Sequence, residues 1–225
     1  MKPIMEKVAE LLEKKKFSEA ARILDQSITE EPKNPEGYTN FGNLLIAVGQ
    51  PEKALAFFKR ALELDPGDAS AFFGYGNALF ETGNEKEALD AFGSAQKAGL
   101  ENGDLYYMIG RSALNIGRSG QALAAFQRAV ELNGSDVEAR FQYGLALARF
   151  GQINGAAKQF HQVLEAEPEH ADACYNLGVV ATLRGNTGEA QTFFQKALKR
   201  NPKHLLAANG LKELKRQSSS ADHQE

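Results

Sequence analysis

Few side chains in this chain have the types and spacing that catalysis or metal binding requires. It has four histidines, namely His161, His170, His204 and His223. None has a cysteine, histidine or carboxylate at a spacing that suits a metal ion. His170 and His204 are 34 residues apart in the loops EPEH and NPKH, where capping of a helix is the ordinary role. The glycines form no phosphate-binding loop. The sequence therefore predicts no catalytic residue, no metal and no cofactor, and we expect a protein that is not an enzyme.

The composition excludes further classes of protein. Among 225 residues, 26 Lys and Arg face 29 Asp and Glu, and this slightly acidic balance lacks the clustered cations of a general nucleic-acid binder. Hydrophobic residues make up 43%, enough for a buried core. Cys174 is the only cysteine, which excludes an intramolecular disulfide and suits a reducing compartment. No apolar run approaches the ~20 residues of a membrane span. We therefore expect a cytoplasmic protein that binds neither nucleic acid nor membrane.

A period of 34 residues runs through the chain, carried by small residues and one aromatic position. One glycine series is Gly42, Gly76, Gly110, Gly144 and Gly178. A second lies seven residues further on, at Gly49, Gly83, Gly117, Gly151 and Gly185. The aromatic series is Phe58, Phe92, Phe126, Phe160 and Phe194, each four residues after an alanine. The units are 1–34, 35–68, 69–102, 103–136, 137–170 and 171–204, without insertions.

Each unit has the signals of two antiparallel helices. Asn34 and Pro35 form a helix start. Counting places from the first residue of each unit, the glycine at place fifteen, such as Gly49, ends one helix before the next begins. Asn84 followed by Glu87 predicts a capping box. One pair of helices cannot bury its apolar face alone, so neighbouring pairs must stack into a solenoid. We predict a single all-α solenoid over 1–216, with a degenerate first unit and a disordered tail at 217–225. Its last helix, at 205–216, caps the array with Leu206, Leu211 and Leu214 on a common side.

The repeat resembles that of the tetratricopeptide repeat (TPR) family over residues 1–204. The shared features are the small residue at place eight, alanines at places twenty and twenty-seven, and proline at place thirty-two. The strings AGLENGDLYYM (98–108), RAVELN (128–133) and EARFQYG (138–144) resemble small stand-alone bacterial members. The resemblance implies a right-handed superhelix whose first helices line a concave face that binds other proteins.

That resemblance also implies which side chains face the groove, namely those at places two, five, six, nine, twelve and thirteen of each first helix. Place five supplies Thr39 and an aromatic column, place nine supplies Asn and Arg, and place two supplies acids that favour a basic ligand. The predicted partner-binding residues are Glu36, Thr39, Asn40, Asn43, Phe73, Asn77, Asp104, Tyr107, Arg111, Phe141, Gln142, Tyr175 and Asn176.

Structural roles compete with binding at several of these places. The acids in the first helical turn also suit the helix dipole, and the aromatics also suit packing between neighbouring first helices. A solvated helix face explains Arg111 equally well. The carboxylate clamp by which chaperone-binding TPR domains hold an acidic C-terminus is absent, because Thr39 stands where the clamp needs lysine and Gly74 where it needs asparagine.

We therefore expect a non-catalytic adaptor or scaffold that binds a peptide or a partner's helix in its groove. One alternative is a self-associating structural module, a monomer or weak homo-oligomer, built through the open ends of the solenoid. A second is RNA binding by the same face, against which the acidic balance argues. The sequence does not name the partner.

Overall fold

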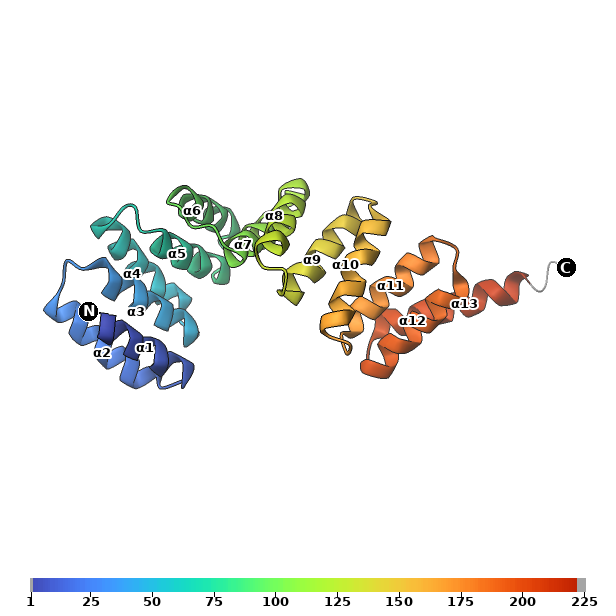
Figure 1. Cartoon of the computed structure of the whole chain (residues 1–225), viewed down its shortest axis with the longest axis horizontal. Helices are drawn as coiled ribbons and strands as arrows, with labels where there is room; N and C mark the ends of the chain where they lie inside the picture. The colour runs from blue at the N-terminus through green and yellow to red at the C-terminus, as the bar shows by residue number, and fades with distance from the viewer. Residues whose placement is uncertain (1, 222–225) are drawn as a thin grey trace. The chain divides into compact units, whose positions relative to one another are not determined.

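The computed structural model describes residues 2–221 and shows an all-α protein in that range. Its helices are α1 (Lys2–Glu13), α2 (Phe17–Glu30), α3 (Pro35–Ala47), α4 (Pro51–Leu64), α5 (Ala69–Glu81), α6 (Glu85–Lys97), α7 (Gly103–Asn115), α8 (Ser119–Leu132), α9 (Val137–Arg149), α10 (Ile153–Ala166), α11 (Ala171–Leu183), α12 (Thr187–Arg200) and α13 (Leu205–Ala221). Odd-numbered and even-numbered helices alternate as the first and second helix of each repeat (Figure 1).

Contacts divide the chain into two compact units, residues 1–125 and 126–225, which we call the N-terminal and C-terminal units. In the N-terminal unit α3 packs against α4 and α5, and α5 packs against α6. In the C-terminal unit α9 packs against α10, and α11 packs against α12 and α13. The first helices of repeats two, three, five and six thus contact their own second helices, as the 34-residue period predicts. One continuous solenoid over 1–216 stays a prediction.

Two kinds of loop connect the helices, and they differ in how the next helix begins. Between repeats the capping residue is extended, and its side chain accepts backbone N–H groups of the next helix. Asn34 accepts from the Glu36 N–H at 3.0 Å, for example. Within a repeat the chain first passes through a left-handed residue such as Gly49, at φ 72°. The residue after it, Gln50, has ψ 54° and makes no side-chain cap.

The capping box predicted at Asn84 is therefore wrong. Asn84 follows the left-handed Gly83 and has ψ 60°, and its side chain makes no cap. Its Nδ2 instead donates to the Thr82 hydroxyl at 2.9 Å. The sequence signal was sound for an extended residue, but the preceding glycine turn leaves Asn84 in another conformation.

The core of each repeat is a phenylalanine held against glycine. Phe58, Phe92 and Phe160 have no exposed surface, and Phe194 is 3% exposed. A Cβ built on Gly42 would lie 2.7 Å from the Phe58 ring, and one built on Gly144 would lie 2.7 Å from Phe160. Absence of a side chain at place eight therefore makes room for the ring, and a small residue is required there.

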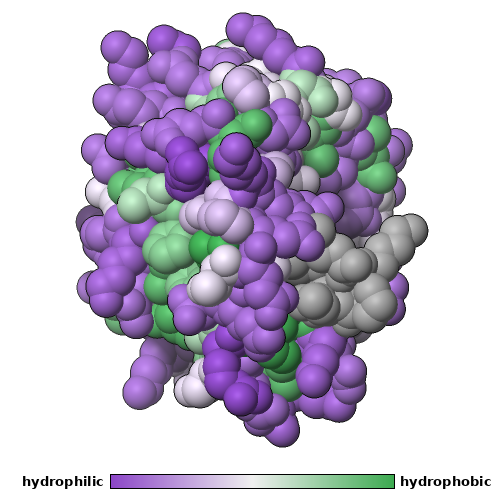
Figure 2. All heavy atoms as spheres, turned by 90° about the vertical axis from the view of Figure 1, so that its left-hand side faces the viewer, coloured by the Kyte–Doolittle hydropathy of each residue, from purple (hydrophilic) through white to green (hydrophobic). Residues whose placement is uncertain are grey.

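The first repeat replaces this arrangement with aliphatic packing. Val8, at 2% exposure, packs in one cluster with Leu24 and Leu44, which are 0% and 2% exposed. Lys15 takes the left-handed conformation, φ 55°, that glycine takes in the later repeats. On the side of the N-terminal repeats the surface is mostly hydrophilic, with apolar residues in narrow strips (Figure 2).

The last helix differs from the prediction in length and in the face it buries. α13 runs to Ala221, so the segment 217–221 is helical rather than disordered, because no glycine or proline stops the helix after 216. Residues 222–225 lie outside the described range. Leu214 is buried at 6%, but Leu206, which was expected on the same side, is 57% exposed. The residue buried in its place is Ala207, one position further along the helix.

Candidate peptide-binding surface

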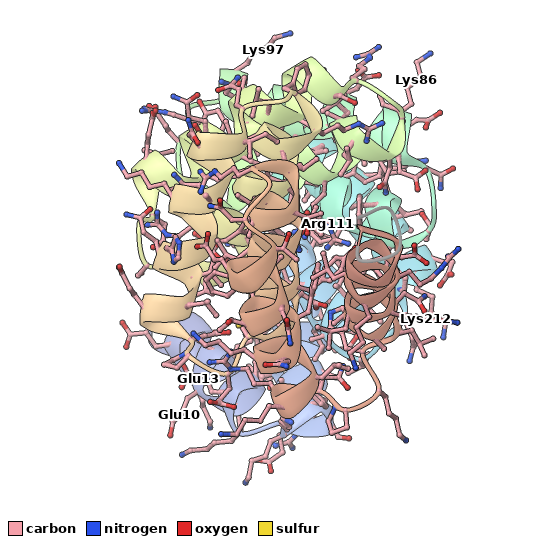
Figure 3. All side chains as sticks on the ribbon, turned by 90° about the vertical axis from the view of Figure 1, so that its right-hand side faces the viewer. Glu10, Glu13, Lys86, Lys97, Arg111 and Lys212 are labelled. Carbon is pink, nitrogen blue, oxygen red and sulfur yellow. The ribbon has the colours of Figure 1, made fainter. Side chains whose placement is uncertain are left out.

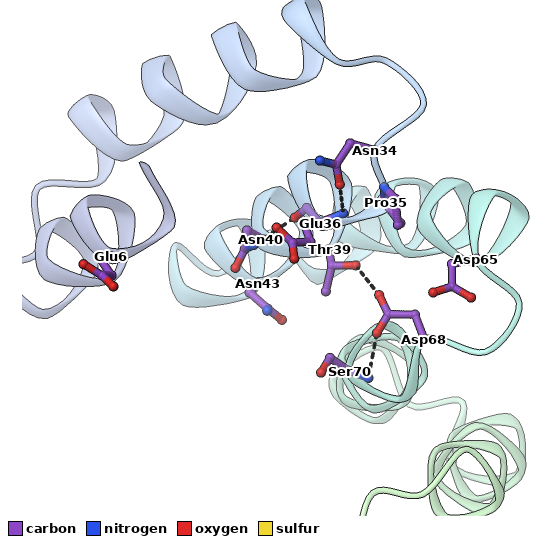
Figure 4. Close-up of a pocket in the computed structure, with 10 residues that line it drawn as sticks. All are labelled: Glu6, Asn34, Pro35, Glu36, Thr39, Asn40, Asn43, Asp65, Asp68 and Ser70. Atoms are coloured by element: carbon purple, nitrogen blue, oxygen red, sulfur yellow. Dashed lines mark hydrogen bonds between the residues drawn. The ribbon is translucent and has the colours of Figure 1, made fainter. Parts of the chain in front are cut away.

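In repeats two, five and six, place five of the first helix contacts the residue that caps the next repeat. In the N-terminal unit the Thr39 hydroxyl donates to Asp68 Oδ2 at 3.0 Å, and Asp68 Oδ1 accepts from the backbone N–H groups of Ser70 and Ala71 at 2.9 and 3.0 Å (Figure 4). Thr39 is only 5% exposed. Its polar group is thus committed to positioning α5 against α3, not to a partner.

In the C-terminal unit the same place is aromatic and the cap is histidine. The rings of Phe141 and His170 are 4.7 Å apart, and those of Tyr175 and His204 are 5.0 Å apart. The Nδ1 of His170 accepts from the Ala173 N–H at 3.2 Å, which confirms its predicted role as a helix cap. His204 accepts from a backbone N–H three residues further on in the same way, also at 3.2 Å.

Place-five aromatics also pack on the core phenylalanine of their own repeat. The ring centroids of Phe73 and Phe92 lie 5.7 Å apart, as do those of Phe141 and Phe160. Those of Tyr175 and Phe194 lie 5.8 Å apart. Phe141 retains 8% exposure, so it offers a partner little surface. These aromatics thus pack against the second helix of their own repeat, which differs from the expected packing between neighbouring first helices. Phe73 and Tyr175 are half-buried and keep part of the ring accessible.

Place six is satisfied by its own helix. Asn40 Nδ2 donates to the Glu36 carbonyl, and Asn176 Nδ2 donates to the Asp172 carbonyl, both at 2.8 Å. Gln142 Nε2 donates to a Glu138 carboxylate oxygen at 2.7 Å. These three side chains already have partners one turn back, which gives a local reason for polar residues inside a helix.

Place nine of repeats two to four differs from all of these. Asn43, Asn77 and Arg111 make no hydrogen bond or ion pair with any residue that the structure describes. Asn77 Oδ1 is shielded from solvent without a donor, which costs free energy unless a partner arrives. Buried polar groups are ordinarily satisfied, so the Asn77 oxygen is a signal for a ligand within the N-terminal unit, and Asn43 and Arg111 are exposed at the same place of the neighbouring first helices.

A cavity of about 850 Å³ surrounds Asn43 (Figure 4). Its lining is acidic, with no lysine or arginine: Glu6, Asn34, Pro35, Glu36, Thr39, Asn40, Asn43, Asp65, Asp68 and Ser70. Glu36 stands in the first turn of α3, so it also serves the helix dipole. The cavity nevertheless places four carboxylates around one opening, which attracts cations.

A second cavity, of about 570 Å³, lies along α5 and α7 and has a different character. Aromatic and aliphatic side chains make up most of its lining: Ile46, Phe73, Asn77, Phe80, Glu81, Asp104, Tyr107, Met108 and Arg111. The Arg111 guanidinium carbon lies 4.7 Å from the centre of the Phe80 ring and 5.7 Å from that of Tyr107. Two rings from different helices thus hold one cation at the cavity.

Sequence reasoning missed several lining residues. Phe80 and Ile46 stand at place twelve, which the family resemblance also points toward the groove, so the signal was available. Glu6 stands at place six of the degenerate first repeat, so a groove position also pointed to it, whereas Asp65 and Asp68 belong to a loop that no groove position covers. Of the thirteen predicted residues, the first nine along the chain line these two cavities, and Phe141, Gln142, Tyr175 and Asn176 belong to the C-terminal unit.

The C-terminal unit contains the only cysteine, and its surroundings are structural. Cys174 has no exposed surface and lies against the Arg200 guanidinium. Burial raises the pKa of the Cys174 thiol, which keeps it in its unreactive protonated form. Within residues 2–221 no group of three or more His, Cys, Asp or Glu side chains is arranged to hold a metal ion. Over the same range, no helix is both long enough and apolar enough to cross a membrane.

Comparison with known proteins agrees with this architecture. Two tetratricopeptide repeat profiles match the chain, one over residues 8–169 and the other over residues 144–204. The chain therefore belongs to the tetratricopeptide repeat family. No curated protein sequence matches it.

Among solved structures the chain is similar to YrrB, described as a TPR protein with an unusual peptide-binding site. The two share 43% identity with a TM-score of 0.79, over 85% of this chain and 99% of YrrB. MamA shares 23% identity at a TM-score of 0.67, over 72% of this chain and 95% of MamA. The pilF protein of Pseudomonas aeruginosa shares 15% identity at a TM-score of 0.83, over 94% of this chain and 96% of pilF. The latter two show the fold alone.

Proposed function

We propose that the protein is a non-catalytic cytoplasmic adaptor or scaffold of bacteria that holds a peptide segment or a helix of a partner protein on the first helices of its repeats. The observation that carries this proposal is the place-nine series. Asn43, Asn77 and Arg111 line two adjoining cavities and have no polar partner among the described residues. An asparagine amide both donates and accepts, as a peptide backbone requires.

The similarity to YrrB supports the same function, because that protein is described as having a peptide-binding site and is 43% identical. Exposed aromatic surface at Phe73 and Tyr107 adds contact area at a low entropic cost. The place-five and place-six contacts explain how the helices that carry the site are fixed. The proposal therefore assigns binding to place nine and its cavity walls, and positioning to places five and six.

The test is affinity capture from a native bacterial lysate with quantitative mass spectrometry. Wild type is compared with a variant carrying Asn43→Ala, Asn77→Ala, Tyr107→Ala and Arg111→Ala. A matched control carries Lys86→Ala and Lys97→Ala, two exposed residues whose side chains extend away from the ribbon (Figure 3). Circular dichroism first establishes that all three fold alike. We expect a protein retained by wild type and control but lost from the variant; equal retention by all three contradicts the proposal.

Self-association is a second candidate, favoured by exposed leucines in the C-terminal unit. Leu183, Leu205 and Leu206 are 65%, 77% and 57% exposed. Apolar side chains this accessible are typical of surfaces that become covered. Light scattering over a concentration series measures the mass directly. A monomer at all concentrations removes this candidate, whereas a mass that falls on Leu205→Lys supports it.

A further inference from the structure

The cavity around Arg111 has a feature that peptide binding in general does not explain. Its guanidinium lies over two rings, 4.7 Å from Phe80 and 5.7 Å from Tyr107, yet no carboxylate within residues 2–221 is paired with it. Here 18 acidic residues share residues 1–125 with 14 basic ones, and Arg111 remains without an ion pair.

Stacking fixes the plane of the guanidinium and leaves its edge available. An arginine carries five N–H donors in a planar fork, which matches the two oxygens of a carboxylate. Because Phe80 and Tyr107 restrict the side chain before any ligand arrives, less conformational entropy is lost on binding. Arg111 is therefore a prepared anion receptor.

The neighbouring acidic residues limit the ligand to one negatively charged group at Arg111. Glu81 and Asp104 line the same cavity as Arg111, and the adjoining cavity carries four further carboxylates. A polyanion such as RNA would place several phosphates against these acids and be repelled. One carboxylate at Arg111, on a ligand that is otherwise neutral or basic, avoids that repulsion.

The remaining walls favour a large apolar group beside the carboxylate. Ile46, Phe73 and Met108 line the cavity with carbon, and its volume of about 570 Å³ accommodates an aromatic or long aliphatic side chain. Toward the N-terminal repeats, the acidic cavity complements lysine or arginine on the same ligand. The acidic cavity thus favours a basic group of the ligand, and the cavity at Arg111 favours an acidic group, so the ligand has a preferred direction along the N-terminal unit.

We propose that Arg111 and the rings around it bind a carboxylate on a partner polypeptide, next to a large apolar side chain of that polypeptide, while a lysine or arginine further along the same segment enters the acidic cavity. The ligand is a mixed-charge segment with a fixed direction on the N-terminal unit. This proposal rests on the proposed function and names its ligand class.

Selection from a random peptide library tests it. Peptides of about twelve residues, long enough when extended to pass both cavities, are displayed with free C-termini and selected on the full-length protein. The same selection is run on Arg111→Gln and on the control Arg118→Gln, an exposed arginine that lines neither cavity and makes the same charge change. Selected peptides are then synthesised with free and with amidated C-termini.

We expect wild type and Arg118→Gln to enrich peptides with Asp, Glu or a terminal carboxylate beside an apolar residue, and a basic residue elsewhere. The selected peptides should bind Arg111→Gln about 10- to 100-fold more weakly than wild type, because a charge-assisted pair is lost. Arg111→Lys should recover part of that affinity. Amidation that abolishes binding assigns the carboxylate to the C-terminus; amidation without effect assigns it to a side chain.

The failures are distinguishable. If peptides are enriched but carry no carboxylate preference, or if Arg111→Gln enriches the same sequences, the ligand class is wrong and the adaptor function stands. If no peptide is enriched on any form of the protein, the ligand class is wrong, and the affinity capture described above decides separately whether the adaptor function stands. Retention of single-stranded RNA that Arg111→Gln abolishes would assign the cavity to phosphate and overturn the peptide ligand.

Discussion

A single added methyl group at Gly74 should destabilise the protein. Gly74 is buried in α5, and a Cβ there would lie 2.5 Å from Phe58 Cζ and closer still to Cε1. The ring cannot withdraw, because Gly42 meets it with similar closeness, at 2.7 Å from Cζ. Alanine gains about 1 kcal/mol over glycine in helix propensity, but overpacking a core costs about 1–3 kcal/mol, and a contact this short belongs to the upper part of that range, about 2–3 kcal/mol. We expect Gly74→Ala to lower the free energy of unfolding by about 1–2 kcal/mol.

The same substitution one helix later provides the control with the opposite sign. Gly93 is inside α6, and a Cβ built on it meets no atom within 4 Å. Only the propensity gain remains, so Gly93→Ala should raise the free energy of unfolding by about 0.5–1 kcal/mol. The two variants therefore differ in stability by about 2–3 kcal/mol for one identical chemical change.

Urea denaturation followed by circular dichroism measures both variants, fitted with a nearest-neighbour repeat scheme because arrays need not unfold in one step. Phe58→Leu supplies a second check, since a smaller side chain at that place should reduce the cost of Gly74→Ala in the double variant. Equal stabilisation by Gly74→Ala and Gly93→Ala would refute the reasoning that glycine is present to admit the ring.

Two further predictions concern the first repeat and the buried thiol. Lys15→Gly should raise the free energy of unfolding by about 0.5–1 kcal/mol, because φ 55° strains any residue with a Cβ; an unchanged urea midpoint would contradict this. Burial raises the pKa of Cys174 above its ordinary 9.0, so the unfolded chain ionises first and stability is complete below that pH but lost as the pH rises past it. Urea midpoints measured against pH should therefore fall above about pH 9 for wild type relative to Cys174→Ala, and parallel curves would disprove it.

Helix boundaries and the core could be predicted because proline fixes φ near its helical value, while glycine adopts a left-handed φ without strain. Gly49 has the left-handed φ that its position requires, and Pro35 and Pro51 begin their helices where the period places them. The capping box at Asn84 was predicted from residue types alone, which do not reveal the ψ that the preceding turn imposes. The helical segment 217–221 was missed because polar composition resembles a tail, although nothing in it stops a helix.

The candidate site could be predicted only in part, for a reason that lies in the packing. A residue at place five lies between the groove and the residue that caps the next repeat. Its type therefore does not indicate whether it contacts a ligand or the cap. Phe141 is 8% exposed while Phe73, at the same place, lines a cavity. At Phe141 the capping residue of the next repeat contributes to this burial, since the His170 ring lies 4.7 Å from that of Phe141.

The contact between place five and the next capping residue limits where the binding specificity of the array can vary. Place five stabilises the next helix start, as Thr39 does through its 3.0 Å hydrogen bond to Asp68, so changing it alters the position of α5 as well as the groove. Place nine makes no such bond at Asn43, Asn77 or Arg111 within the described residues. Substitution there changes ligand contacts at little cost to the fold. Recognition and stability are therefore carried by different places of the same helix, four residues and one helical turn apart.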